Sequence, residues 1–184
     1  GERYVKQQLV PFGEYIPFRD RLEGWISRLE RVSRDFRPGT SPGVLQMGSV
    51  TVADVICFEV AYDEVVRDAV NGGGEVLVVQ TNNATYGRTG QPPQQAVMSR
   101  LRAVEHGRPV LVAATSGVSQ VVAADGTVEQ RTEEFEQRVL SAEVEVRSGR
   151  TVASRVGAAP EWLLVIVALA AVTIAGVRRR RAAG

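Results

Sequence analysis

Apolar runs recur through the first 150 residues and alternate with segments of helical periodicity. Val50 to Ile56 is one such run, broken only by Thr51 and Asp54, and residues 75–80 and 110–114 are two more. Apolar runs of this length are typical of strands that are covered on both faces of a sheet. Residues 62–70 and 91–106 instead carry apolar residues at three- and four-residue spacing, which predicts helices. The alternating order of strands and helices predicts a layered α/β domain.

Two hairpins and an edge strand are expected beside these elements. One hairpin turns at Gly48 and the other at Asp125-Gly126, a dipeptide that strongly favours a tight turn. The alternating segment 139–146 predicts an edge strand. Four apolar residues of the segment 91–106 are expected to face the core: Ala96, Val97, Leu101 and Val104.

An amphipathic segment is expected to form a helix of about four turns between Leu22 and Phe36. Its apolar residues recur at three- and four-residue steps, and arginine and glutamate fill the other face. One interpretation is that the apolar stripe packs on the core. The other is an arm that meets lipid, because basic residues alternate with tryptophan and leucine.

The C-terminal segment differs in kind from the rest of the chain. Trp162 to Val177 contains no charged residue, and four arginines follow at 178–181. This pattern predicts a transmembrane helix over about 158–177, with the arginines on the cytoplasmic side. The alternative is a buried hydrophobic helix. We therefore divide the chain into a domain at 1–150 and, at 151–184, a linker, a transmembrane helix and a cytoplasmic tail.

Composition and charge exclude several classes of function. Apolar residues make up 44% of the chain, enough for a real core. The formal charge is +1, and the arginines at 178–181 account for more than all of it. The remaining chain is mildly acidic, which argues against nucleic acid as a partner. A single cysteine and a single histidine complete neither a disulfide nor a zinc site, and we expect no cofactor or metal.

Cys57 is the central candidate for chemistry. It follows the apolar run 50–56 directly, and Glu59 comes two residues later. An apolar run that stops at a thiol predicts a buried strand that delivers a nucleophile to a sheet edge. The alternative is a buried structural cysteine, because free cysteine is among the most buried residue types.

Three other residues are candidates because of their positions in loops and at strand ends. Glu14 lies between aromatic residues in the loop 11–17, which two prolines and a glycine make rigid. Asn82 lies in the polar loop after the strand 75–80, where ligands gather in layered α/β folds. Lys6 precedes the loop and, taken alone, is expected to be a surface lysine.

Four motifs in order carry a resemblance to a known family. They are Lys6 with Leu9-Val10-Pro11-Phe12-Gly13-Glu14-Tyr15 and Pro17, then Ile56-Cys57-Phe58-Glu59, then Asn82-Asn83-Ala84-Thr85-Tyr86-Gly87, then Arg100-Leu101-Arg102-Ala103-Val104-Glu105 with Gly107-Arg108-Pro109. Over roughly residues 4 to 130, the chain resembles the apolipoprotein N-acyltransferases of the nitrilase superfamily.

The resemblance implies an αββα sandwich, here only its C-terminal part, and a Glu-Lys-Cys triad. Cys57 would be the nucleophile, Lys6 the triad lysine, Glu14 an essential loop glutamate and Glu59 the acid after the nucleophile. A nearby ammonium favours a thiolate, and a carboxylate can accept the proton. Lys6 and the backbone N–H of Phe58 would point at the developing oxyanion, and Asn82 would contribute to the oxyanion or substrate site.

The implied reaction is a two-step acyl transfer at the outer side of a bacterial plasma membrane. Cys57 would take an acyl chain from a membrane phospholipid as a thioester. The N-terminal amine of a diacylglyceryl-cysteine apolipoprotein would then accept it. The segment 22–36 would be a mobile arm at the membrane surface, and we expect a monomer.

Three departures from the family pattern qualify this picture. The triad glutamate that acts as base should precede Lys6, and Glu2 has the wrong spacing. We therefore expect this chain to be part of a longer protein and to be inactive alone. Phe58 replaces the usual tyrosine. Thr85-Tyr86 and Gln95 replace the more common Trp-Phe and His, and these replacements are expected to affect acyl preference. The alternatives are a nitrilase-type amidase that hydrolyses C–N bonds and a non-catalytic membrane-anchored domain.

Overall fold

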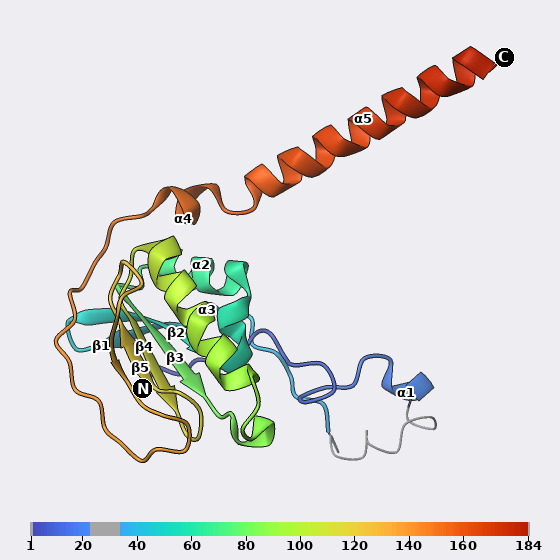
Figure 1. Cartoon of the computed structure of the whole chain (residues 1–184). Helices are drawn as coiled ribbons and strands as arrows, with labels where there is room; N and C mark the ends of the chain where they lie inside the picture. The colour runs from blue at the N-terminus through green and yellow to red at the C-terminus, as the bar shows by residue number, and fades with distance from the viewer. Residues whose placement is uncertain (1, 23–33, 184) are drawn as a thin grey trace.

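The computed structural model describes residues 2–22 and 34–183, in which one mixed sheet is the central element (Figure 1). The sheet has six strands in chain order: β1 (Val44–Met47), β2 (Val50–Ile56), β3 (Val76–Thr81), β4 (Val110–Ala114), β5 (Gln120–Val122) and β6 (Val128–Arg131). β2, β3 and β4 run parallel, whereas β1 and the β5–β6 hairpin pair antiparallel. Apart from the edge strand at 139–146, the predicted strands, both hairpins and the α/β class are confirmed.

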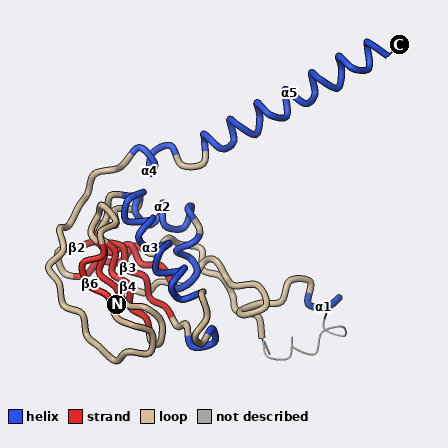
Figure 2. The backbone as a smooth tube through the Cα atoms, in the orientation of Figure 1, coloured by secondary structure: helices blue, strands red, loops and turns tan. Residues whose placement is uncertain are grey.

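Two helices connect the parallel strands and pack over one face of the sheet (Figures 1 and 2). α2 (Asp63–Asn71) joins β2 to β3, and α3 (Gln91–His106) joins β3 to β4. Two 3₁₀ turns, η2 (Cys57–Ala61) and η3 (Ala84–Tyr86), follow the carboxyl ends of β2 and β3. The described residues thus contain one sheet and one helical layer of the predicted αββα arrangement.

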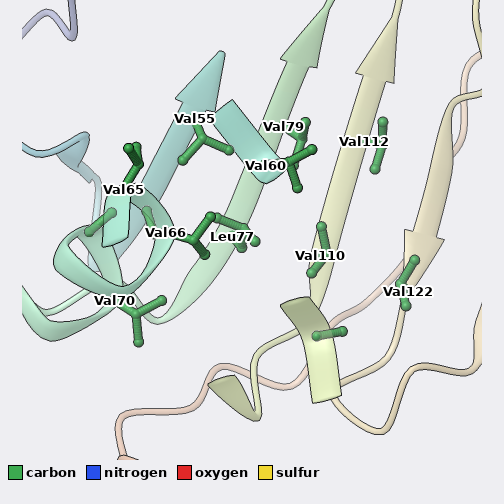
Figure 3. Packing of buried hydrophobic residues seen from close by; sticks show 13 residues of the cluster. Val55, Val60, Val65, Val66, Val70, Leu77, Val79, Val110, Val112 and Val122 are labelled. Atoms are coloured by element: carbon green, nitrogen blue, oxygen red, sulfur yellow. The ribbon is translucent and has the colours of Figure 1, made fainter. Parts of the chain in front are cut away.

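The hydrophobic core lies between this helical layer and the sheet (Figure 3). Alternate residues of each strand point toward the helices, because successive side chains of a strand face opposite sides. Leu77 and Val79 of β3 and Val110 of β4 meet Val65 and Val66 of α2 in this layer, and all five are buried. β-Branched residues dominate the layer, as expected for buried parallel strands.

The predicted core face of α3 is largely wrong. Ala96 is buried, but Val97, Leu101 and Val104 are exposed. The helix instead buries a face made mostly of polar residues: Gln95, Ser99, Arg102, Ala103 and His106. This face is stable because the surroundings pair most of its polar groups, although Gln95 Nε2 and His106 Nε2 have no hydrogen-bond partner among the described residues. The guanidinium of Arg102, for example, donates from Nε to the backbone oxygen of Val60 at 2.8 Å.

The predicted edge strand at 139–146 is also wrong. These residues belong to an extended loop that runs from the end of β6 to α4 (Val152–Val156), without strand pairing (Figure 2). Val139 and Val146 of the alternating pattern are exposed, so their side chains face no core. The loop is held instead by single contacts, such as the 2.7 Å bond from Gln130 Nε2 to the backbone oxygen of Ser141.

The predicted helix between Leu22 and Phe36 falls mainly on residues 23–33, which lie outside the described residues. Before them, α1 (Arg19–Leu22) forms a single turn. After them, Phe36 is exposed, and its backbone N–H donates to the backbone oxygen of Glu14 at 2.9 Å.

The C-terminal helix α5 (Ala159–Ala183) extends away from the sheet (Figure 1). Within the described chain it is the one helix that is long and apolar enough to cross a membrane, by length and composition. Its apolar side chains are exposed along its length, which does not fit the alternative of a buried hydrophobic helix.

A buried polar contact attaches the segment before α5 to the domain. His106, the last residue of α3, is fully buried, and its Nδ1 lies 2.8 Å from Ser154 Oγ in α4. Burial lowers the pKa of this imidazole below its ordinary value of 6.5. The charge of Glu105 opposes this shift, and the charges of Arg102 and Arg108 add to it. His106 is therefore neutral in the folded state near neutral pH.

This neutral histidine predicts a loss of stability on mild acidification. Between the lowered folded-state pKa and the unfolded value of 6.5, the unfolded chain binds a proton that the folded chain does not, so the free energy of unfolding decreases as pH falls below 6.5. Denaturant unfolding from pH 7.5 to 5.5 would measure this slope. Because His106 is the only histidine, His106→Asn should flatten it. An unchanged slope in that variant would contradict the assignment.

Candidate active site

Cys57 occupies a turn at the carboxyl end of a central strand. It follows β2 directly and begins η2, with a backbone φ of 60°. A positive φ is unfavourable for a residue other than glycine, and such strain is often found at functional sites. Val55 and Val60 are buried on either side of the turn and hold it in place. The thiol itself is only partly buried, so the position differs from that of a structural core cysteine.

The carboxylate of Glu59 joins this turn to the N-terminal segment. Its side chain is completely buried, and Oε2 accepts the backbone N–H of Ile56 at 2.8 Å. Oε1 accepts the backbone N–H groups of Gln7 at 2.6 Å and Gln8 at 2.9 Å. One carboxylate thereby connects the backbone immediately before Cys57 to the backbone immediately after Lys6.

Tyr4 adds a fourth donor to the same carboxylate. Its hydroxyl lies 2.9 and 3.0 Å from the two oxygens of Glu59. Burial raises the pKa of Tyr4, and the negative charge of Glu59 raises it further, so the phenol stays protonated and donates. Sequence reasoning missed this residue. Its position two residues before Lys6 in an extended segment, where alternate side chains share a face, is the signal that could have identified it.

Lys6 and Glu14 form an ion pair beside this junction. The ammonium of Lys6 lies 2.7 and 2.8 Å from the two oxygens of Glu14, and the lysine is largely buried. Glu14 also accepts the backbone N–H of Val10 at 2.9 Å. The expectation of a surface lysine is therefore wrong, and the structure brings two of the predicted site residues into direct contact.

Tyr86 in η3 lies within electrostatic reach of Cys57 and Glu14. Burial raises the pKa of its phenol, and the nearby Cys57 and Glu14 act in the same direction. Tyr86, Val10 at the start of the loop that carries Glu14, and Phe58 of the cysteine turn line one cavity, so these three segments meet at one edge of the sheet. This edge holds the carboxyl ends of the parallel strands, where ligands bind in open α/β sheets.

Phe58 and Asn82 have different surroundings. The ring of Phe58 is 39% exposed and meets Tyr62 edge to face, with ring centroids 5.9 Å apart. Asn82 is exposed, and its Oδ1 accepts the backbone N–H of Ala84 and the hydroxyl of Thr115. Among the described contacts, those of Asn82 order its own loop, and none joins it to Cys57.

A cavity of about 490 Å³ adjoins the cysteine turn. Its wall combines apolar and amide side chains: Val10, Phe58, Tyr86, Gln91, Gln94, Gln95 and Met98. Within the described residues, no group of three His, Cys, Asp or Glu side chains gathers in a way that would hold a metal ion. The arrangement therefore joins a cysteine turn, through Glu59, to the segment that carries a cation–carboxylate pair, beside a mainly apolar cavity. Such a combination suits acyl chemistry.

Comparison with known proteins connects this geometry to named relatives. The carbon-nitrogen hydrolase family model matches residues 1–153. The chain is 39% identical over 175 residues to the apolipoprotein N-acyltransferase of Mycolicibacterium smegmatis, and 35% identical over 179 residues to that of Geobacter metallireducens. These alignments cover 95% and 97% of the chain, but 29% and 34% of the relatives. The chain thus spans about a third of the length of these curated relatives.

A solved structure of the nitrilase superfamily has a similar fold. A mutant of the Nesterenkonia AN1 amidase, from the nitrilase superfamily, is 26% identical with a TM-score of 0.51. The match covers 72% of this chain and 46% of the amidase. Another mutant of that amidase shows the result of Michael addition of acrylamide at its active site cysteine.

The four donors around Glu59 predict a large effect of neutralising this carboxylate. Glu59→Gln removes the charge and replaces one accepting oxygen by a donating NH2 group. Backbone N–H groups of Ile56, or of Gln7 and Gln8, then face a donor instead of an acceptor. It should lower the free energy of unfolding by about 2–4 kcal/mol, since hydrogen bonds to buried charges are worth roughly 1.5–3 kcal/mol each. It should also speed alkylation of Cys57 by iodoacetamide, because the turn loosens.

Tyr4→Phe provides the matched control, since it removes one donor and leaves the backbone bonds intact. Its cost should be about 1 kcal/mol. If Glu59→Gln costs no more than Tyr4→Phe in denaturant unfolding, Glu59 does not hold the turn in the way described.

Proposed function

Because the chain belongs to the carbon-nitrogen hydrolase family, we propose that it is the cysteine-bearing part of an N-acyltransferase that matures lipoproteins. The ion pair of Lys6 with Glu14, held next to the Cys57 turn by Glu59, is the observation that carries this proposal. The names of the relatives from M. smegmatis and G. metallireducens support the same activity. We take residues 1–150 as the catalytic part and 151–184 as linker, transmembrane helix and tail.

In the proposed first step, the thiolate of Cys57 attacks an acyl ester carbonyl of a phospholipid. The C–S bond forms while the C–O bond to glycerol breaks, and the departing alkoxide takes the proton that the base removed from the thiol. The backbone N–H of Phe58 and the ammonium of Lys6 donate to the oxyanion that develops on the carbonyl oxygen. Glu14 holds the ammonium in place. The base that removes the proton from the Cys57 thiol is the glutamate that the family resemblance assigns to a position before Lys6.

In the second step, the N-terminal amine of a diacylglyceryl-cysteine apolipoprotein attacks the thioester. The C–N bond forms, the C–S bond breaks, and the proton lost by the amine balances the charge of the released thiolate. The same oxyanion donors serve this step, because a tetrahedral intermediate forms on the same carbonyl carbon. Asn82 contributes through the order that it imposes on the loop before Tyr86.

The proposed substrates both lie in a bilayer, and α5 provides a way to hold the site next to it. The helix is apolar and exposed, and Arg178 to Arg181 follow its apolar part directly. By the positive-inside rule these arginines lie in the cytoplasm, so the catalytic part lies on the outer side of the plasma membrane. The segment 22–36 is the proposed arm at that surface.

The amidase alternative has one specific observation in its favour, the likeness to the Nesterenkonia AN1 amidase. Both activities begin with the same nucleophilic attack by a thiolate. They differ in what releases the acyl group from sulfur, since water does so in an amidase and an amine does so in an N-acyltransferase. The cavity wall and the exposed apolar helix favour a long-chain substrate over a small amide.

Acyl transfer through Cys57 predicts a hydroxylamine-sensitive palmitoyl label on the full-length protein that contains this chain. Cys57→Ala should abolish both the label and the N-acylation of a diacylglyceryl lipopeptide in liposomes. Lys6→Ala should lower the rate of label formation by about 10²–10³-fold, the usual effect of removing an oxyanion donor. Mass spectrometry of the labelled cysteine peptide measures the first step.

Glu143→Gln, a change in an exposed side chain of the long loop, should leave both steps unchanged. Retention of lipopeptide acylation in Cys57→Ala would disprove the catalytic assignment. Ammonia release from short amides without any lipid dependence would instead favour the amidase.

A further inference from the structure

We propose that the hydroxyl of Tyr86 donates a hydrogen bond to the glycerol oxygen that leaves the acyl carbon when Cys57 attacks a phospholipid. This inference rests on the proposed function and deepens it, because it gives a donor to the one oxygen of the reacting ester that the Phe58 N–H and the Lys6 ammonium do not serve. Tyr86 is then a catalytic residue, since it touches the reacting ester.

The register of the sheet places the turn of Tyr86 beside the cysteine turn. β2 and β3 are parallel neighbours, and Ile56 lies opposite Gln80 near their carboxyl ends. The cysteine turn follows Ile56 directly, and the segment that leads to η3 begins just after Gln80, so both segments leave the sheet at the same level. Phe58 and Tyr86, one from each segment, line the same cavity.

A buried asparagine fixes the turn that carries Tyr86. Asn83 is 2% exposed, and its Nδ2 donates to Oε1 of Gln95 in α3 at 2.8 Å. The backbone oxygen of Asn83 accepts the backbone N–H of Tyr86 at 3.0 Å, within η3. The position of Tyr86 is thus set from α3 before any substrate binds, and pre-positioned donors stabilise a developing charge most effectively.

The hydroxyl of Tyr86 is free and accessible. The residue is only partly buried, and its hydroxyl donates to no described residue and is not one of the enclosed polar atoms that lack a partner. Because burial and the nearby Cys57 and Glu14 raise the pKa of the phenol, it stays protonated near neutral pH. Of the described residues that line the cavity, Tyr86 alone carries an O–H group.

The spacing between Tyr86 and Cys57 suits a substrate atom between them. Cys57 is close enough to act on the phenol electrostatically, yet the hydroxyl makes no hydrogen bond to the thiol of this described residue. The phenol therefore does not hold the sulfur itself. A hydrogen bond of about 2.8 Å from the phenol to an oxygen on the attacked carbon bridges such a gap.

The reacting ester has two oxygens, which need different donors. The carbonyl oxygen becomes the oxyanion, to which the Phe58 N–H and the Lys6 ammonium are assigned. The glycerol oxygen gains negative charge as its bond to carbon breaks, so a hydrogen bond to it strengthens during that step. The phenol keeps its own proton, and the alkoxide still receives the proton that the base removed from the thiol.

This role predicts that the effect of removing the hydroxyl depends on the leaving group. Thioester formation on Cys57 of the full-length protein is measured by mass spectrometry in single turnovers with a dipalmitoyl phospholipid and with p-nitrophenyl palmitate. A glycerol alkoxide is a poor leaving group, whereas p-nitrophenolate is stable without a hydrogen bond. Tyr86→Phe should slow the phospholipid reaction about 10- to 100-fold, the loss expected for a hydrogen bond to a charged group, and leave the p-nitrophenyl ester reaction nearly unchanged.

The ratio of the two rates separates this role from a structural one. Both donors acylate the same thiol, so a general disturbance of the cysteine turn would slow both reactions and cancel in the ratio. Tyr62→Phe is the matched control. It removes the hydroxyl of a tyrosine whose ring contacts Phe58 but which is not among the described lining residues, and it should keep the wild-type ratio.

A wild-type ratio in Tyr86→Phe overturns the inference, whether both rates fall or neither does. An equal change of the ratio in Tyr62→Phe also overturns it. If the wild-type protein forms no thioester on Cys57 from the phospholipid, the proposed function itself fails, which distinguishes the two results.

Discussion

The buried carboxylate of Glu59 is the interaction on which the arrangement of the site depends. It accepts hydrogen bonds from the backbone of Ile56, Gln7 and Gln8 and from the hydroxyl of Tyr4. A charge buried without such partners would be strongly unfavourable, so the donors and the carboxylate must be ordered together. Because the donors come from both sides of the site, satisfying this one charge positions the lysine segment against the cysteine turn.

A second polar network connects the cysteine turn to the C-terminal helices through α3. Arg102 is buried and donates to the backbone oxygens of Val60 and Ala61, which end the turn that Cys57 begins. Four residues later, His106 contacts Ser154 of α4, just before α5. The polar face of α3 thus links the turn that carries the thiol to the segment that leads into the apolar helix. This explains why the helix buries polar residues and exposes Val97, Leu101 and Val104.

The parts of the fold that local pattern predicted are those in which one periodicity dominates. β2, β3 and β4 were predictable because their residues are mostly apolar and mostly buried, as is typical of the central strands of a parallel sheet. α3 was predictable as a helix, from its prolines at the start and Gly107 at the end, but its buried face was not. Apolar residues predict a core only when nothing else competes for it, and here backbone oxygens of the cysteine turn attract Arg102. The strand predicted at 139–146 does not form. Its alternating residues would need one face to be buried, but Val139 and Val146 are exposed.

The sequence by itself determined the chemistry that is present: one thiol after a buried strand, a carboxylate two residues later, and a rigid loop that carries a second carboxylate. Only the tertiary structure decided which groups meet. Lys6 pairs with Glu14 rather than with solvent, and Glu59 binds backbone about fifty residues away. Such contacts depend on the relative positions of distant segments, and those positions follow from packing and from the pairing of buried polar groups, which no local pattern records.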